Sequence, residues 1–76
     1  MARYDVKHIG PGPGFIGSVV EKTSFFGITT WVLVRDPSRE GDTWDKWVNK
    51  RNGAYEYAGG TNQLSRVLWA HAYDKR

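Results

Sequence analysis

The 76-residue sequence predicts a small α+β domain: a twisted antiparallel sheet of four or five strands, partly barrel-like, closed by a C-terminal helix. Three observations lead to this prediction. Ile28 to Arg35 consists almost entirely of β-branched and aromatic residues, which favour strands. Asn52-Gly53 separates two short segments, as in a β-hairpin. Leu64 to Tyr73 carries apolar residues at helical spacing. The alternative architecture is a truncated, Rossmann-like α/β layer of βαβαβα order.

The composition predicts one densely packed domain, residues 1–76, that has no disulfide or structural metal to stabilise it. The chain has four Trp, four Tyr and three Phe, but no Cys and only two His. Buried rings remove large apolar areas from water, whereas no disulfide can form and a structural zinc lacks its ligands. With no long apolar window and no signal-like start, we expect a complete, cytoplasmic chain that engages neither a membrane nor a metal.

The N-terminal third contains one expected strand, one loop and one segment that stays open. Arg3 to Ile9 alternates loosely between apolar and polar residues, which favours a half-exposed strand. Gly10 to Gly14 reads Gly-Pro-Gly-Pro-Gly, and its two prolines lack amide donors, so a loop is expected. Phe15 to Phe26 has a helical stripe of apolar residues but the Val, Thr and Phe content of a strand.

The middle of the chain predicts a second strand and then a hairpin. Ile28 to Arg35 is the clearest strand, and we expect Asp36-Pro37-Ser38 to end it. Ser38 to Thr43 is charged and is expected to be an exposed connection. Trp44 to Lys50 spaces its apolar residues like a helical turn. The Asn52-Gly53 signal nevertheless favours a hairpin with strands at Lys46–Lys50 and Ala54–Ala58.

The C-terminal segment predicts a helix packed on one side. Gly59-Gly60 breaks the preceding strand, and Thr61 or Asn62 is a suitable N-cap. The apolar stripe has the i, i+3, i+4, i+7, i+8 spacing of a helix with one covered face. It consists of Leu64, Val67, Leu68, His71 and Ala72, with Trp69 and Tyr73 on its flank.

The glycine-rich loop also matches a cofactor-binding pattern. Gly12 to Gly17 fits G-x-G-x-x-G, and Asp36 follows at about the distance of the dinucleotide fingerprint. Gly14 to Val20 and Gly27 to Asp36 resemble the N-terminal nucleotide-binding segment of NmrA and isoflavone-reductase-like proteins. Asn52 to Gly59 is similar to their third strand.

That resemblance implies a half-Rossmann fragment that binds NADP. Gly12, Gly14 and Gly17 would line the pyrophosphate, and Arg35 would meet the 2′-phosphate. We treat this as an alternative to the antiparallel fold, in which no cofactor is expected.

The aromatic and basic residues of the predicted hairpin are the main candidates for function. The expected contact surface comprises Lys46, Lys50 and Arg51, with whichever of Trp47 and Tyr55 is exposed. Alternate residues of a two-stranded ribbon face opposite sides, so one face can join the core while the other presents rings among charges.

We therefore expect a non-enzymatic binding module that contacts a protein partner with an acidic surface, an accessory or inhibitor protein of the kind that phages and mobile elements encode. His8 and Lys7 beside the loop raise the possibility of acid–base catalysis, but the sequence shows no converging second group. The net charge of +3 allows a nucleic-acid binder as the alternative class.

Overall fold

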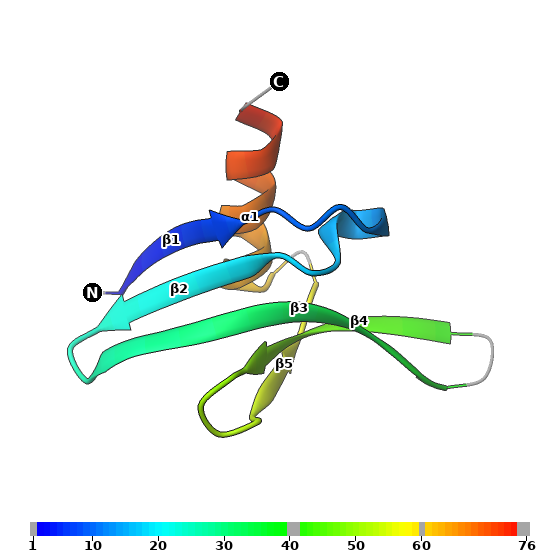
Figure 1. Cartoon of the computed structure of the whole chain (residues 1–76), viewed down its shortest axis with the longest axis horizontal. Helices are drawn as coiled ribbons and strands as arrows, with labels where there is room; N and C mark the ends of the chain where they lie inside the picture. The colour runs from blue at the N-terminus through cyan, green and yellow to red at the C-terminus, as the bar shows by residue number, and fades with distance from the viewer. Residues whose placement is uncertain (1, 40–41, 60, 75–76) are drawn as a thin grey trace.

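A computed structural model describes residues 2–39, 42–59 and 61–74; the side chains of 36–39 and 42–44 lie outside this description. Within these residues, five strands form one antiparallel sheet in the order β1-β2-β3-β4-β5, and a helix packs on one face (Figure 1). The elements are β1 (Arg3–His8), a 3-10 turn η1 (Pro13–Phe15), β2 (Val19–Ser24), β3 (Gly27–Arg39), β4 (Asp42–Asn49), β5 (Tyr55–Tyr57) and α1 (Gln63–Asp74).

The predicted α+β class is confirmed, with two refinements. The sheet stays open, so the expected partial barrel is not formed. The alternative βαβαβα layer is also not formed, because every strand pair is antiparallel and neighbours in sequence are neighbours in the sheet. Figure 1 shows α1 beside β1, running across the strands, with β5 at the opposite edge.

Residues 15–26, which the sequence left open, contain a strand. β2 pairs with β1 on one side and with β3 on the other, and this supplies partners for its backbone groups. Val20 is fully buried beneath the helix, whereas Val19 points to the other face. The strand is selected by these two neighbours, since the local sequence suits either structure.

β3 is longer than predicted, which corrects the expected end at Asp36-Pro37-Ser38. The strand continues to Arg39 and its partner strand begins at Asp42, so much of the expected Ser38–Thr43 connection is strand. The ladder is irregular between the Asp36–Trp44 and Arg39–Asp42 pairs. A proline can be accommodated there because a regular amide donor is not required at a ladder irregularity.

The hairpin around Asn52-Gly53 is confirmed, although its turn differs from the expected two-residue type. Asn49 N–H donates to the Ala54 carbonyl (2.7 Å), and Gly53 N–H donates to the Asn49 carbonyl (2.8 Å). Gly53 has φ +77°, a left-handed conformation, while Asn52 does not have positive φ. Residues 50–53 therefore form a longer loop closed by glycine. Trp44–Lys50 runs as strand up to Asn49, not as a helical turn.

The helix begins with Asn62 as its N-cap, one of the two predicted residues. The Asn62 side-chain oxygen accepts a hydrogen bond from Ser65 N–H (3.1 Å), which satisfies a free donor of the first turn. Ser65 is buried and accepts a hydrogen bond from the Trp47 indole N–H (2.8 Å), so the covered face includes a serine absent from the predicted stripe. The buried apolar residues are Val20, Trp31, Leu33, Trp47, Leu64 and Leu68. Among the described residues, α1 has neither the length nor the apolar run needed to cross a bilayer.

We expect Leu68→Asp to abolish the cooperative thermal melt, because Leu68 is fully buried. Losing this side chain and burying a carboxylate should together cost at least about 3 kcal/mol, a large share of a small domain's stability. Ala70→Asp, at an exposed position of the same helix, is the control and should melt like the wild type. A cooperative melt of Leu68→Asp would mean that α1 is not docked.

Candidate functional site

The strand register divides the sheet into a covered face and an open face. Directly opposed residues of an antiparallel ladder point to the same side. Leu33 pairs with Trp47, and both are buried under α1. Their neighbours Val32 and Val48 also pair with each other, so they lie on the face that the helix leaves uncovered.

The open face carries a continuous apolar row that crosses four strands. Val19 pairs with Val32, Val32 with Val48, and Val48 with Tyr55. The three valines are half-buried and Tyr55 is 53% exposed. A second row runs beside it from Val34 through Lys46 to Tyr57. We call these seven residues the open-face patch: Val19, Val32, Val34, Lys46, Val48, Tyr55 and Tyr57.

The aromatic end of this patch is organised by ring and cation contacts. The Tyr55 and Tyr57 rings meet edge to face with centroids 5.5 Å apart. The Lys46 ammonium lies 4.6 Å from the Tyr55 ring centroid, within the range of a cation–π contact. These contacts hold both rings on the surface in a fixed arrangement, so little further ordering is needed when a partner covers them.

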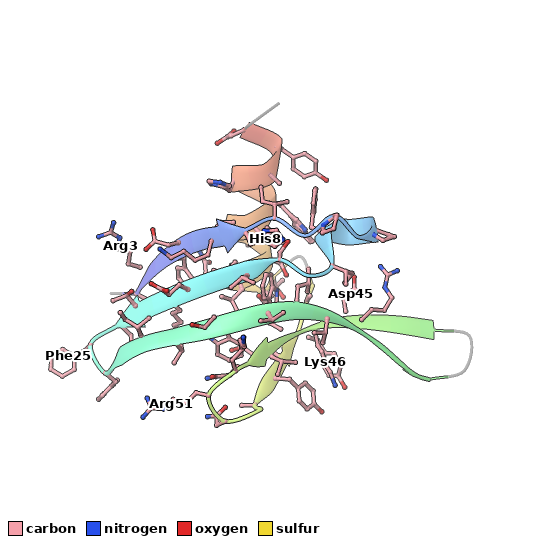
Figure 2. All side chains as sticks on the ribbon, viewed as in Figure 1. Arg3, His8, Phe25, Asp45, Lys46 and Arg51 are labelled. Atoms are coloured by element: carbon pink, nitrogen blue, oxygen red, sulfur yellow. The ribbon has the colours of Figure 1, made fainter. Side chains whose placement is uncertain are left out.

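The fold leaves four of the five predicted contact residues at least partly exposed and buries the fifth, Trp47. Lys46 and Tyr55 come together on the open face, and Lys50 and Arg51 are exposed in the adjoining β4–β5 loop. Figure 2 shows Lys46 and Arg51 on the side of the molecule away from α1. Trp47, by contrast, is fully buried and hydrogen-bonded to Ser65, so it belongs to the core and leaves Tyr55 as the exposed ring.

The predicted contact residues do not include Tyr57 or the valines of the patch, although Tyr57 lies in the same predicted hairpin as Tyr55. Tyr57 is 55% exposed and lies next to Lys46 across the β4–β5 ladder. A signal was present, because Val32 and Val34 alternate with the buried Trp31 and Leu33. Because both sets of alternating side chains in β3 are apolar, the sequence does not show which face of the strand the helix covers.

The glycine loop is built as a structural brace for the sheet. Gly10 N–H donates to the Ser18 hydroxyl (2.8 Å), which in turn donates to the Phe15 carbonyl (2.6 Å). Gly17 N–H bonds to the Leu33 carbonyl (2.9 Å), and Leu33 N–H returns a bond to Ser18 (2.9 Å). The loop thereby extends the β2–β3 pairing beyond Val19.

This loop does not fit the NADP site of the alternative hypothesis. A dinucleotide pyrophosphate is bound at a helix N-terminus, but the loop that holds Gly12, Gly14 and Gly17 is followed by strand β2. Arg35, the expected 2′-phosphate ligand, instead bonds Asp45 (3.0 Å) and the Pro13 carbonyl (3.2 Å). Its guanidinium ties the loop to β3 and β4.

The two histidines, far apart in sequence, share one shallow pocket. His8 of β1 and His71 of α1 line an open depression of about 260 Å³ together with Val6, Lys7 and Ile9. The helix docking against β1 creates this neighbourhood. The sequence spacing carries no signal for it, because residues 8 and 71 lie on different elements. Among the described residues, no three His, Asp or Glu side chains form a group that could hold a metal.

We expect Gly10→Ala to destabilise the domain by about 1–3 kcal/mol or more, as forced overpacking does. A Cβ at this position would lie 2.0 Å from the Ile16 carbonyl oxygen and 2.7 Å from Ser18 N, both backbone atoms. Urea unfolding measures the effect. Gly59→Ala is the control, because a Cβ there meets nothing within 4 Å. Equal stability of the two variants would contradict the bracing role of the loop.

Comparison of the chain with protein-family models, with curated proteins and with solved structures finds no match in any of the three. The resemblance to the NmrA and isoflavone-reductase-like proteins therefore stays a prediction from short motifs.

Proposed function

We propose that this chain is a non-enzymatic binding module, of the accessory or inhibitor type, that contacts a protein partner through the open-face patch. The observation that carries the proposal is the uncovered row of Val19, Val32, Val48 and Tyr55. Contiguous apolar surface rimmed by polar groups is characteristic of interaction sites. A preformed sheet surface also loses little conformational entropy when a partner covers it.

The composition of the patch suits a protein partner. Interface centres are enriched in aromatic residues and poor in charges, and tyrosines frequently dominate the binding energy. Here Tyr55 and Tyr57 lie next to the valines, with Lys46 on the ring of Tyr55. Aliphatic side chains provide shape-specific packing against a protein, while offering little to a purely charged ligand.

The rim charges favour a partner whose surface is acidic. Lys50 and Arg51 are exposed in the loop next to β5, and the whole chain carries a net charge of +3. Cations at the edge of an interface mainly accelerate association with an oppositely charged partner, and this effect weakens with salt. We therefore propose that the open-face patch supplies most of the binding energy, whereas Lys50 and Arg51 mainly raise the association rate.

The first test locates and then measures the contact. A photo-crosslinking residue at position 55 should form an adduct with a protein, whereas the same residue at position 73, exposed on α1, should not. With that protein purified, we expect Lys50→Glu/Arg51→Glu to slow association about tenfold at low salt. The melting temperature should barely change, because both residues are exposed.

The control for this variant reverses the same number of charges elsewhere. Lys7→Glu/Arg66→Glu alters two other exposed positions, and should affect association much less. Equal slowing by both variants would indicate a general effect of net charge. Normal association of Lys50→Glu/Arg51→Glu, with an adduct only at position 73, would move the contact to the helix.

A second candidate function is supported by the paired tyrosines. Exposed rings on a sheet, close to cations, are the elements with which single-stranded nucleic acids are bound by stacking and phosphate contacts. Tyr55, Tyr57 and Lys46 supply these elements on a small scale. The aliphatic row is not explained by this function, so protein binding ranks first.

Titration with single-stranded oligonucleotides separates the two functions. We expect no submicromolar affinity at physiological salt. Few cations adjoin the tyrosines, so few phosphates would be neutralised, and the electrostatic contribution to binding grows with the number of neutralised phosphates. Fluorescence anisotropy over a range of salt concentrations measures this. Submicromolar, salt-sensitive binding that is lost in Tyr55→Ala would place nucleic acid ahead of protein as the ligand.

A further inference from the structure

Two phenylalanines project from the tip of the β2–β3 hairpin, where the core cannot use them. Phe25 and Phe26 are each 93% exposed, and their rings meet edge to face with centroids 5.5 Å apart. In Figure 2, Phe25 lies at the extreme end of the molecule's long axis. We call this pair the aromatic tip. Two large rings held in solvent at a protruding turn point to a contact outside the domain.

The turn itself does not require aromatic residues. Ser24 pairs with Gly27, so Phe25 and Phe26 form the connection between the strands. Neither has positive φ; the left-handed conformation that closes the turn belongs to Gly27, with φ +126°. Small polar residues occupy such turns more readily than phenylalanine does. The rings therefore have no evident role in shaping the hairpin.

Basic residues from two other segments lie at the same end of the sheet. Arg3 pairs with Thr23, two residues before Phe25. Lys50 N–H bonds to the Thr30 carbonyl, which brings the β4–β5 loop with Arg51 to this end as well. Figure 2 shows Arg3 and Arg51 set back from Phe25 on opposite sides. The Arg3 Nε atom lies 3.8 Å from the Asp5 Oδ2 atom, but the Arg3 side chain remains 79% exposed.

We propose that the aromatic tip inserts into the interface of an anionic lipid membrane, with Arg3, Lys50 and Arg51 contacting the headgroups. Peripheral proteins bind in this way when exposed aromatic side chains enter the headgroup and acyl boundary while adjoining cations meet anionic lipids. The arrangement matches this requirement, because Phe25 projects further from the molecule than Arg3 and Arg51 do. The rings would therefore enter the apolar boundary while the cations stay at the level of the headgroups.

The shape of the tip favours lipid over a protein pocket. The rings protrude from a convex turn, and a deformable interface can surround both of them, whereas a protein would need a deep preformed cavity at this point. The open-face patch, by contrast, is a sheet surface suited to a protein. The expectation that the chain engages no membrane rested on the missing apolar span, and a hairpin tip needs no span.

The test is co-sedimentation with vesicles, using the full chain. We expect binding to phosphatidylcholine vesicles that contain phosphatidylglycerol, weaker binding to pure phosphatidylcholine, and loss of binding at high salt. Phe25→Ser/Phe26→Ser should lower the partition coefficient at least about tenfold, with an unchanged thermal melt, because both rings are exposed. Tyr57→Ser is the matched control, removing an exposed ring of the open-face patch, and should bind vesicles normally.

Each outcome decides the proposal. It is overturned if the wild type binds neither vesicle, if the Phe25→Ser/Phe26→Ser variant binds as well as the wild type, or if Tyr57→Ser reduces binding equally. It is also overturned if the wild type does not bind vesicles and the Phe25→Ser/Phe26→Ser variant loses binding to a protein partner. The rings would then fill a pocket in that protein. Retained partner binding by a tip variant that no longer binds vesicles would support lipid insertion independently of the proposed function.

Discussion

The burial of Trp47 between the sheet and the helix is the constraint on which the rest of the structure depends. Its indole ring is fully covered, and its N–H donates to the Ser65 hydroxyl of α1. A buried indole N–H without a partner would be costly, so the hydrogen bond sets where the first turns of the helix lie across β4. Once Trp47 points inward, strand geometry directs Lys46 and Val48 outward. The position of one ring thus decides which face of the sheet is available for binding.

One short helix leaves half of this sheet uncovered, and the candidate function follows from that imbalance. α1 has 12 residues, whereas β3 alone has 13. The covered face holds the two core tryptophans, and the open face keeps a row of valines that ends in Tyr55. An antiparallel sheet can tolerate one solvated face, which is then usually polar. An apolar row on the open face is therefore an argument for a partner, and the two exposed phenylalanines at one end of the same sheet are an argument for a second contact.

The glycine loop shows why a short motif needs its structural context. G-x-G-x-x-G binds pyrophosphate when a strand precedes it and a helix follows, because the helix N-terminus supplies amide donors. In this fold the donors of Gly10 and Gly17 are used by Ser18 and Leu33. Gly10 is required for close backbone packing, since a Cβ would collide with the Ile16 carbonyl. Gly17, the last glycine of the cofactor-like pattern, and its neighbour in the loop, Gly10, thus serve to brace the sheet.

Local sequence patterns determined the α+β class, the Asn52-Gly53 hairpin, the helix around Leu68 and a cap at Thr61 or Asn62, because each depends on periodicity or turn chemistry within a few residues. Tertiary structure decided the rest. Residues 15–26 became strand because two neighbours pair with them, and β3 passed Pro37 because the ladder is irregular there. The exposure of Tyr55 but not Trp47, and the placement of His8 and His71 around one pocket, depend on where α1 packs. A pattern of period two identifies two faces of a strand, but only contacts distant in sequence determine which face is buried.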